Sequence, residues 1–174
     1  MGLERDGLMA RITFDNQSKF YEQLKQLEAL AQKDEFLERA VAKGADPVAD
    51  EIRKRLGALP SEKFRRLHGG DSFHVLSDSA KADLLAGFGL APIQRDKTGF
   101  VNTKAGFEGY GSHPTATYPY GVPNQLIARA VESGSSVRDK MPFVRPAVKA
   151  AQKDAIKAME DSVDEDMKKI FEGG

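Results

Sequence analysis

The side chains that most often carry chemistry are scattered in this chain. The three histidines, His68, His74 and His113, lie in turn-like segments, and no two have the i, i+4 spacing of a helical metal site. A histidine in such a context is ordinarily a surface or capping residue. One polar constellation for a hidden active site combines His113 with Asp96 and Tyr118, but nothing in their spacing supports it. We therefore predict no metal site here.

The motifs of common enzyme classes are also missing from the sequence. The chain has no cysteine, which excludes disulfides, thiolate metal ligands and a thiol nucleophile. It contains no G-x-S-x-G elbow and no P-loop lysine. Gly87-Phe88-Gly89 does not continue as a dinucleotide loop, because Pro92 stands where the third glycine belongs. The sequence predicts neither catalysis nor a cofactor.

The charge of the chain is balanced, with 26 basic and 26 acidic residues among 174. A net charge of zero argues against broad attraction to nucleic acids or membranes, and it leaves little self-repulsion against association. No apolar run approaches the roughly 20 residues of a membrane span. The first residues, "MGLERDGLMARITF", lack the apolar block of a signal peptide. We expect no membrane partner.

One basic cluster stands out against this balance. Six cations lie within 14 residues: Arg53, Lys54, Arg55, Lys63, Arg65 and Arg66. They could bind phosphates as a nucleic-acid-binding module, for example on DNA near a portal. They could instead be the solvated end of a helix, where cations interact favourably with the helix dipole. We favour the solvated helix end, because Phe64 is the one interleaved aromatic residue and makes no stacking platform.

The elements that must position these residues begin with a helical region, 15–57. A short strand is predicted at 11–14 and a helix at 18–31. A second helical run starts near Asp34, and Pro47 interrupts it, so it is either two short helices or one kinked helix.

Glycine and proline dominate the middle region, 69–142. It holds 10 of the 16 glycines and five of the eight prolines. We predict one or two helical turns over Ala80–Phe88 and a strand over Gly99–Phe107. A long loop follows with Tyr110, Tyr118 and Tyr120, and loops of this length are usually functional or mobile.

Two more helices complete the predicted fold. Asn124 is placed to cap a helix over 125–132, which Gly134 ends. The C-terminal helix spans 146–171, since apolar residues recur there every three or four positions. The acidic run "EDSVDED" in it is predicted to be a solvated face. The pattern indicates a single α+β domain over 1–174, in which a small, mostly antiparallel sheet is packed by an N-terminal helix pair and the long C-terminal helix.

The segment from Met141 to Pro146 holds an aromatic residue between two prolines. Pro142 and Pro146 stiffen the backbone around Phe143 and remove two hydrogen-bond donors. Phe143 is then either an anchor presented to a partner's pocket or a hydrophobic staple on its own helix. The residues alone do not separate these two interpretations.

This segment resembles a signature of the tailed-bacteriophage head–tail joining or tail-completion family, the gene product 10-like tail components of lambdoid phages. The family pattern V-E-x-G-[TS] is matched by Val131, Glu132, Gly134 and Ser135, and the pattern P-F-x-R-P-A is matched by 142–147. The segment "LPSEKFRRLHGGDSFHVLSDSAKADLLAGFGLAP" departs from the "aP-x-x-T-G-x-L-r-x-S" of other members. With the enlarged tyrosine-rich region, it looks like the branch found with contractile tails.

The resemblance implies a structural protein with no catalysis and no cofactor. It implies subunits that form a ring, commonly sixfold, at the junction of tail and head, made in the bacterial host cytoplasm and carried in the virion. The partners would be other copies and neighbouring neck and tail proteins, with DNA contact as a lesser alternative. The predicted interface residues are Glu132, Met141, Pro142, Phe143, Arg145, Pro146, Tyr110, Tyr118 and Tyr120. Arg145 is expected to make a bidentate pair with a carboxylate, Glu132 first, within or between subunits.

Overall fold

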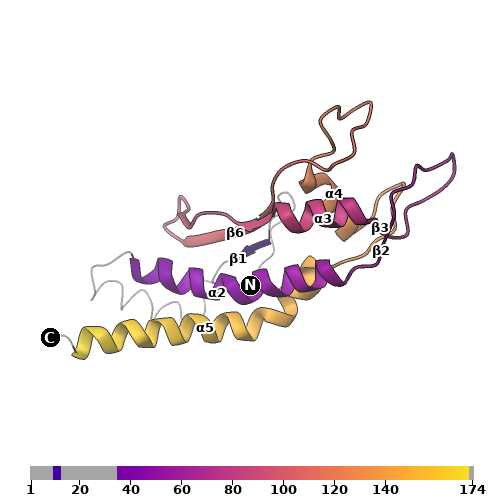
Figure 1. The fold of residues 1–174 in the computed structure, drawn as a ribbon. Coiled ribbons are helices and arrows are strands. Elements are labelled where there is room, and N and C mark those ends of the chain that lie inside the picture. Colours follow the sequence, from indigo (N-terminus) through magenta and orange to yellow (C-terminus); the bar gives the residue numbers. More distant parts are fainter. Residues whose placement is uncertain (1–9, 13–34, 173–174) are drawn as a thin grey trace.

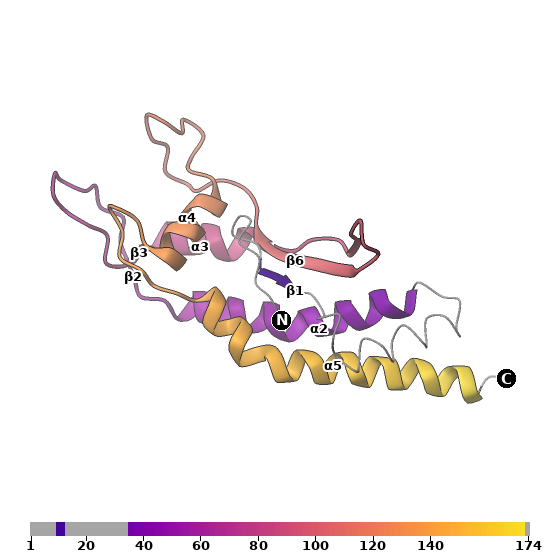
Figure 2. The same ribbon diagram turned by 180° about the vertical axis from the view of Figure 1, so that it is seen from behind.

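A computed structural model describes residues 10–12 and 35–172, with 10–12 and 169–172 described by backbone alone. It is an α+β fold in which a small antiparallel sheet lies over two long antiparallel helices, as expected (Figure 1). These helices are α2 (Glu35–Ala58) and α5 (Val144–Glu172). Seen from behind, α2 lies between the sheet and α5 (Figure 2). The C-terminal helix therefore packs along the far side of α2. The predicted helix at 18–31 lies outside the described residues.

Strand β6 (Val101–Phe107) is the centre of the sheet. It pairs antiparallel with β1 (Ala10–Ile12), β4 (Phe88–Leu90) and β5 (Gln94–Arg95). Five of its seven residues are buried, and three of these, Val101, Asn102 and Thr103, are consecutive, so both faces of the strand are covered at its start. The predicted strand is thus confirmed, with its start two residues later. A separate parallel pair joins β2 (Ser61–Glu62) to β3 (Leu76–Ser77).

Helix α2 runs unbroken through Pro47. The alternative of two short helices was wrong, because buried residues recur at helical spacing on both sides of the proline: Phe36, Leu37, Ala40, Val41, Ala45, Val48, Ala49, Ile52 and Leu56. Pro47 removes one donor, whose acceptor would be the carbonyl of Lys43. Lys43 is exposed, so this position lies on the solvent side of the helix.

Close packing joins α2 to α5 at two points. A Cβ on Gly44 would lie 2.4 Å from Cγ of Met159, so the glycine makes room for that side chain. Farther along, Nε of Arg39 donates to Oδ2 of Asp166 at 2.8 Å, and Asp166 is 7% exposed. The prediction of a solvated acidic face is therefore wrong for Asp166, which ties the end of α5 to the start of α2.

Two short helices stand at one end of the sheet: α3 (Asp78–Gly87) and α4 (Asn124–Ser133). Helix α3 was expected over nearly the same residues, and Ser77 caps it by accepting from the Ala80 amide. Asn124 does not cap α4, because it is already the first helical residue. Its Nδ2 instead donates to the carbonyls of Asp83 and Glu108, at 3.2 and 2.8 Å. Gly134 ends α4 with φ of 79°, as predicted.

The buried hydrophobic residues of α2, α3, β4, β6, α4 and α5 form one cluster. Phe107 of β6 lies near its middle, with the Phe88 ring 5.2 Å away and the Phe143 ring 6.0 Å away. Among the described helices, none is long and apolar enough to cross a membrane.

Candidate functional site

The junction between α4 and α5 contains the predicted motif, and Glu132 is its central residue. Glu132 is 4% exposed. Its Oε2 accepts from the backbone amides of Phe143 and Val144 at 2.7 and 2.9 Å, and its Oε1 accepts from the amide of Arg145 at 3.1 Å. A carboxylate at this position satisfies amides that have no partner within the helix and lies at the positive end of the helix dipole.

The second proline of the motif completes this first turn of α5. Pro146 has no amide hydrogen, so it adds no donor that Glu132 would have to satisfy. The next amide, that of Ala147, donates to the carbonyl of Phe143 at 3.2 Å. A further bond from the amide of Met141 to the carbonyl of Val131, at 2.8 Å, closes the loop between the helices. The motif therefore specifies a capped helix junction.

Phe143 is fully buried, so it is not an exposed anchor. Its relative exposure is 0%, and its ring meets that of Phe107 edge-on, with an interplanar angle of 75°. The ring packs in the core of its own chain against Phe107 of β6, a contact with the sheet that differs from the predicted staple on its own helix. The stiff backbone directs the ring inward because Glu132 fixes the amide of Phe143 itself.

Arg145 lies on the outside of the same junction. Its side chain is 59% exposed, and its Nε lies 3.8 Å from Oε1 of Glu132. This pair is within one chain, and it is a single long contact in place of the expected bidentate pair. Pro142 is exposed, whereas Met141 and Pro146 are half-buried. Arg145 and Pro142 are thus the motif residues whose side chains are most open to a partner.

The tyrosine-rich loop projects from the body of the molecule (Figure 1). Its base is closed within the chain, since the Gly111 amide donates to the carbonyl of Val122 at 2.8 Å. Gly121 has φ of 100°, and a Cβ there would lie 1.9 Å from the carbonyl oxygen of Gly111. Tyr110 and Tyr120 are 63% and 88% exposed, while Tyr118 is half-buried. The loop therefore presents aromatic side chains from a closed base.

Most of the basic cluster is neutralised locally. Arg53 pairs with Asp50 at 3.4 Å, and Arg65 pairs with Glu62 at 3.1 Å. Lys54 and Arg55 both pair with Glu51, at 3.1 and 2.8 Å, and the hydrogen bond from Lys54 is the main cause of the lowered pKa of Glu51. Lys63 and Arg66 make no ion pair with any residue of the described ranges. The nucleic-acid interpretation stays a prediction, with two of six cations left unpaired.

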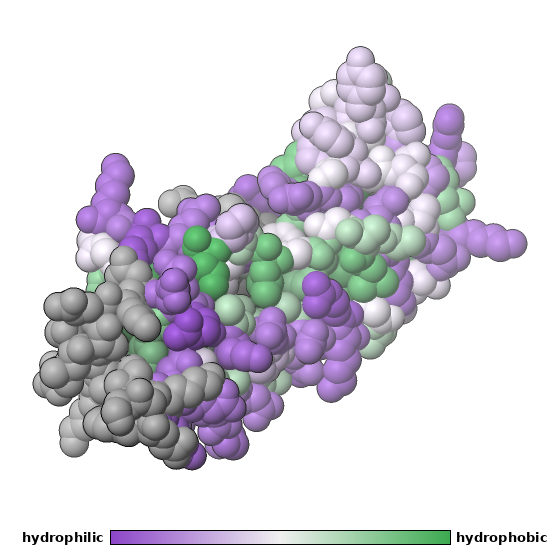
Figure 3. All heavy atoms as spheres, turned by 60° about the vertical axis from the view of Figure 1, so that its left-hand side comes forward, coloured by the Kyte–Doolittle hydropathy of each residue, from purple (hydrophilic) through white to green (hydrophobic). Residues whose placement is uncertain are grey.

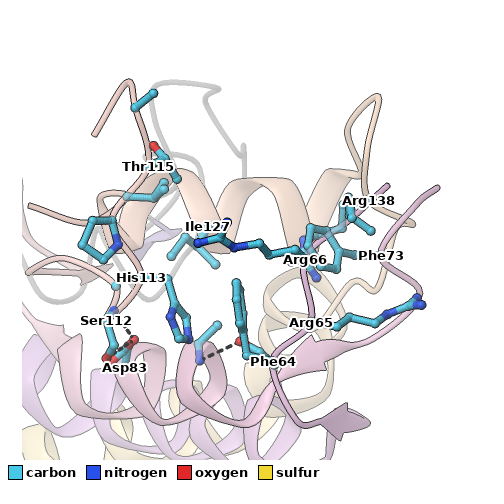
Figure 4. Close-up of a pocket in the computed structure, with 17 residues that line it drawn as sticks. Phe64, Arg65, Arg66, Phe73, Asp83, Ser112, His113, Thr115, Ile127 and Arg138 are labelled. Atoms are coloured by element: carbon cyan, nitrogen blue, oxygen red, sulfur yellow. Dashed lines mark hydrogen bonds between the residues drawn. The ribbon is translucent and has the colours of Figure 1, made fainter. Parts of the chain in front are cut away.

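Beside this cluster, a pocket of about 560 Å³ opens between the 64–67 segment, helix α3 and the base of the tyrosine-rich loop (Figure 4). Its wall includes Phe64 and His113, whose rings stack with centroids 3.9 Å apart. Arg66 reaches across the pocket toward Ile127, whereas Arg65 points away from it. The pocket combines apolar walls with an unpaired cation, a lining that suits an apolar side chain next to a carboxylate.

His113 is held in this pocket by a serine. Its Nε2 lies 2.6 Å from Oγ of Ser79, which in turn lies 3.2 Å from Oγ of Ser77. No carboxylate of the described residues hydrogen-bonds the other ring nitrogen of His113, so the orienting acid of a catalytic triad is missing in this part of the chain. The bond to Ser79 keeps the imidazole flat against Phe64.

The constellation of His113, Asp96 and Tyr118 that a hidden active site would need is not assembled. Asp96 accepts from the Thr98 amide at 2.9 Å and the Phe100 amide at 3.1 Å, within its own turn. Elsewhere His74 pairs with Asp139 at 2.6 Å, both exposed. Within the described ranges, no group of three or more histidine, aspartate and glutamate side chains could hold a metal ion.

The sequence did not indicate this pocket. Asp83 accepts from the amide and the hydroxyl of Ser112, both at 2.7 Å, and so binds the loop base to α3. Arg138 contributes from a third segment, with its guanidinium over the Phe73 ring and its pKa lowered by burial. These residues are far apart in sequence, so no local spacing could have grouped them.

Comparisons with protein families, with curated proteins and with solved structures found no match.

Proposed function

We propose that this protein is a structural, ring-forming subunit of a phage neck or tail terminus, which completes the tail and joins it to the head. The sequence motif at 131–147 supports the proposal, because it is the part that resembles the head–tail joining family. The polar groups of that motif act on the chain's own helix junction and leave its outer surface free for assembly.

The observation that carries the proposal is the exposure of aromatic side chains on projecting loops at one end of the molecule. Phe64, Tyr110 and Tyr120 are 47%, 63% and 88% exposed. They belong to loops that extend past the paired helices (Figure 1). Hydrophobic side chains also form a band across one face, below the projecting loop (Figure 3). Surfaces of this kind mark interaction sites. Neighbours in a ring would cover them through a heterologous contact that closes on itself.

Light scattering across a concentration series tests the proposal. We expect a closed multimer near six subunits whose mass stops rising with concentration. Electron microscopy of the same sample should show rings of one diameter. A strict monomer, both alone and mixed with purified tail tubes, would overturn the proposal. Retention on duplex DNA that falls steeply with salt would favour the nucleic-acid alternative instead.

A further inference from the structure

Charge is separated along this molecule, although its net charge is zero. Residues 50–68, which include the ion-pair partners Asp50 and Glu51, carry six basic and three acidic side chains, and residues 157–168 carry five acidic and two basic. The first segment ends α2 and continues into the loop beside the pocket, whereas the second lies in the far half of α5 (Figure 1). Complementary charges at two separated surfaces favour contact between the front of one copy and the back of the next.

The pocket is the specific feature of the basic end. Its apolar wall includes Phe64, Val122 and Ile127, and Arg66 crosses it without a carboxylate partner among the described residues. An occupant of matching chemistry would present an apolar side chain with a carboxylate next to it.

The outer face of α5 presents this combination. Ile156, Glu160 and Asp164 are each exposed and follow one another at four-residue spacing, so they form one stripe on the helix. Ile156 is 36% exposed, so part of its apolar side chain is open to a partner. Lys157 lies outside this stripe and is already paired with Asp161 at 2.8 Å, a contact that raises the pKa of Lys157. Lys157 makes no ion pair with Glu160, although the Glu160 charge also helps to raise the pKa of Lys157.

We propose that the pocket of one copy receives the α5 stripe of a second copy, with Ile156 in the apolar pocket and Glu160 paired with Arg66. The inference rests on the proposed function and names its subunit contact. A helix laid in an apolar groove through residues four apart is an established mode of recognition. Because the two surfaces differ and lie on separate parts of the chain, the contact is heterologous and can repeat from copy to copy.

A charge exchange tests the contact on the full chain. Arg66→Glu and Glu160→Arg should each weaken self-association about tenfold or more, and the double variant should recover most of the loss. Lys97→Glu is the matched control, since Lys97 is an exposed cation on the β5–β6 turn, which belongs neither to the pocket lining nor to α5. The readouts are sedimentation velocity and light scattering, with circular dichroism to confirm an unchanged fold.

A second measurement uses the absence of cysteine from the sequence. Ala116→Cys places a thiol at the pocket, and Gln152→Cys places one on α5 a turn before Ile156. A mixture of the two single variants, treated with a short bis-maleimide, should yield the mixed cross-linked dimer in excess over either like pair. When Lys97→Cys replaces Gln152→Cys in the mixture, no excess of the mixed cross-linked dimer is expected.

The outcomes separate this contact from the ring itself. In one outcome, multimers persist, but the double variant does not recover self-association and the mixed cross-link does not form. This outcome would overturn the proposed contact and leave the ring proposal standing. Recovery accompanied by masses that grow without limit would support the contact and contradict a closed ring. A chain that is monomeric at every concentration overturns both.

Discussion

The carboxylate of Glu132 lies 2.7 Å from the backbone nitrogen of Phe143, through its Oε2 atom. This one contact joins the end of α4 to the start of α5 across a turn and directs the Phe143 ring into the core. The resemblance drew attention to both residues as interface candidates. Their observed role is internal, and the exposed side chains of the motif are those of Pro142 and Arg145.

Glu132→Gln should lower the free energy of unfolding by about 2–3 kcal/mol, because it replaces a charged acceptor of three amide bonds with a neutral amide that also brings unwanted donors. Urea denaturation of the purified variant measures the loss. Ser133→Ala is the control, since Ser133 is the exposed neighbour on the same turn. A loss below about 0.5 kcal/mol would show that the cap contributes little.

Phe143→Ala should lower the free energy of unfolding by about 3–5 kcal/mol, since it leaves a cavity beside Phe107. Thermal and urea unfolding measure this effect, with Pro142→Ala as the exposed control from the same segment. If the Phe143→Ala variant keeps its stability but loses self-association, Phe143 is an anchor for a partner and its role in the core is contradicted.

Gly121→Ala should disrupt the base of the tyrosine-rich loop. The added methyl group would meet the carbonyl oxygen of Gly111, and the residue would have to keep a positive φ. We expect cleavage at 112–120 by limited proteolysis to rise, while the α2–α5 pair stays protected. Gly99→Ala is a useful comparison, because φ is also positive there but nothing lies within 4 Å of the added Cβ. Equal protection of the loop in Gly121→Ala and the unaltered chain would contradict the tight base.

The lowered pKa of Glu51 predicts a contribution to the free energy of unfolding that is lost when the pH falls into the acidic range. Hydrogen bonds from Lys54 and Arg55 hold this pKa below its ordinary value of 4.5. The folded state therefore binds this proton more weakly than the unfolded state does. The contribution is present above the ordinary pKa and is lost as the pH falls through the lowered one. Glu51→Gln should flatten the decline of stability over that acidic range. Carboxyl carbon NMR of Glu51 checks the pKa directly, and a titration midpoint at or above 4.5 would contradict it.

Local patterns predicted most of the secondary structure that the described residues contain. Apolar spacing placed α5 within two residues of its start, and alternation placed β6 within two residues of its start. Pro47 left the sequence undecided between one helix and two over α2, and the structure has one helix, because contacts with α5 and the sheet hold it together across a local breaker. The prediction that Asn124 caps α4 failed for another reason. Its side-chain amide donates to the distant carbonyls of Asp83 and Glu108 and does not cap its own helix.

By itself, the sequence determined the class of fold, the absence of thiol chemistry and the position of the C-terminal helix, because these follow from composition and short-range periodicity. Only the tertiary structure decided that Phe143 is core and that Glu132 caps α5, since their bond spans 11 residues and depends on how two helices meet. The pocket is likewise a tertiary feature. Its lining comes from the 64–67 segment, the loop base at 111–116 and Ile127, and these come together only when the chain is folded.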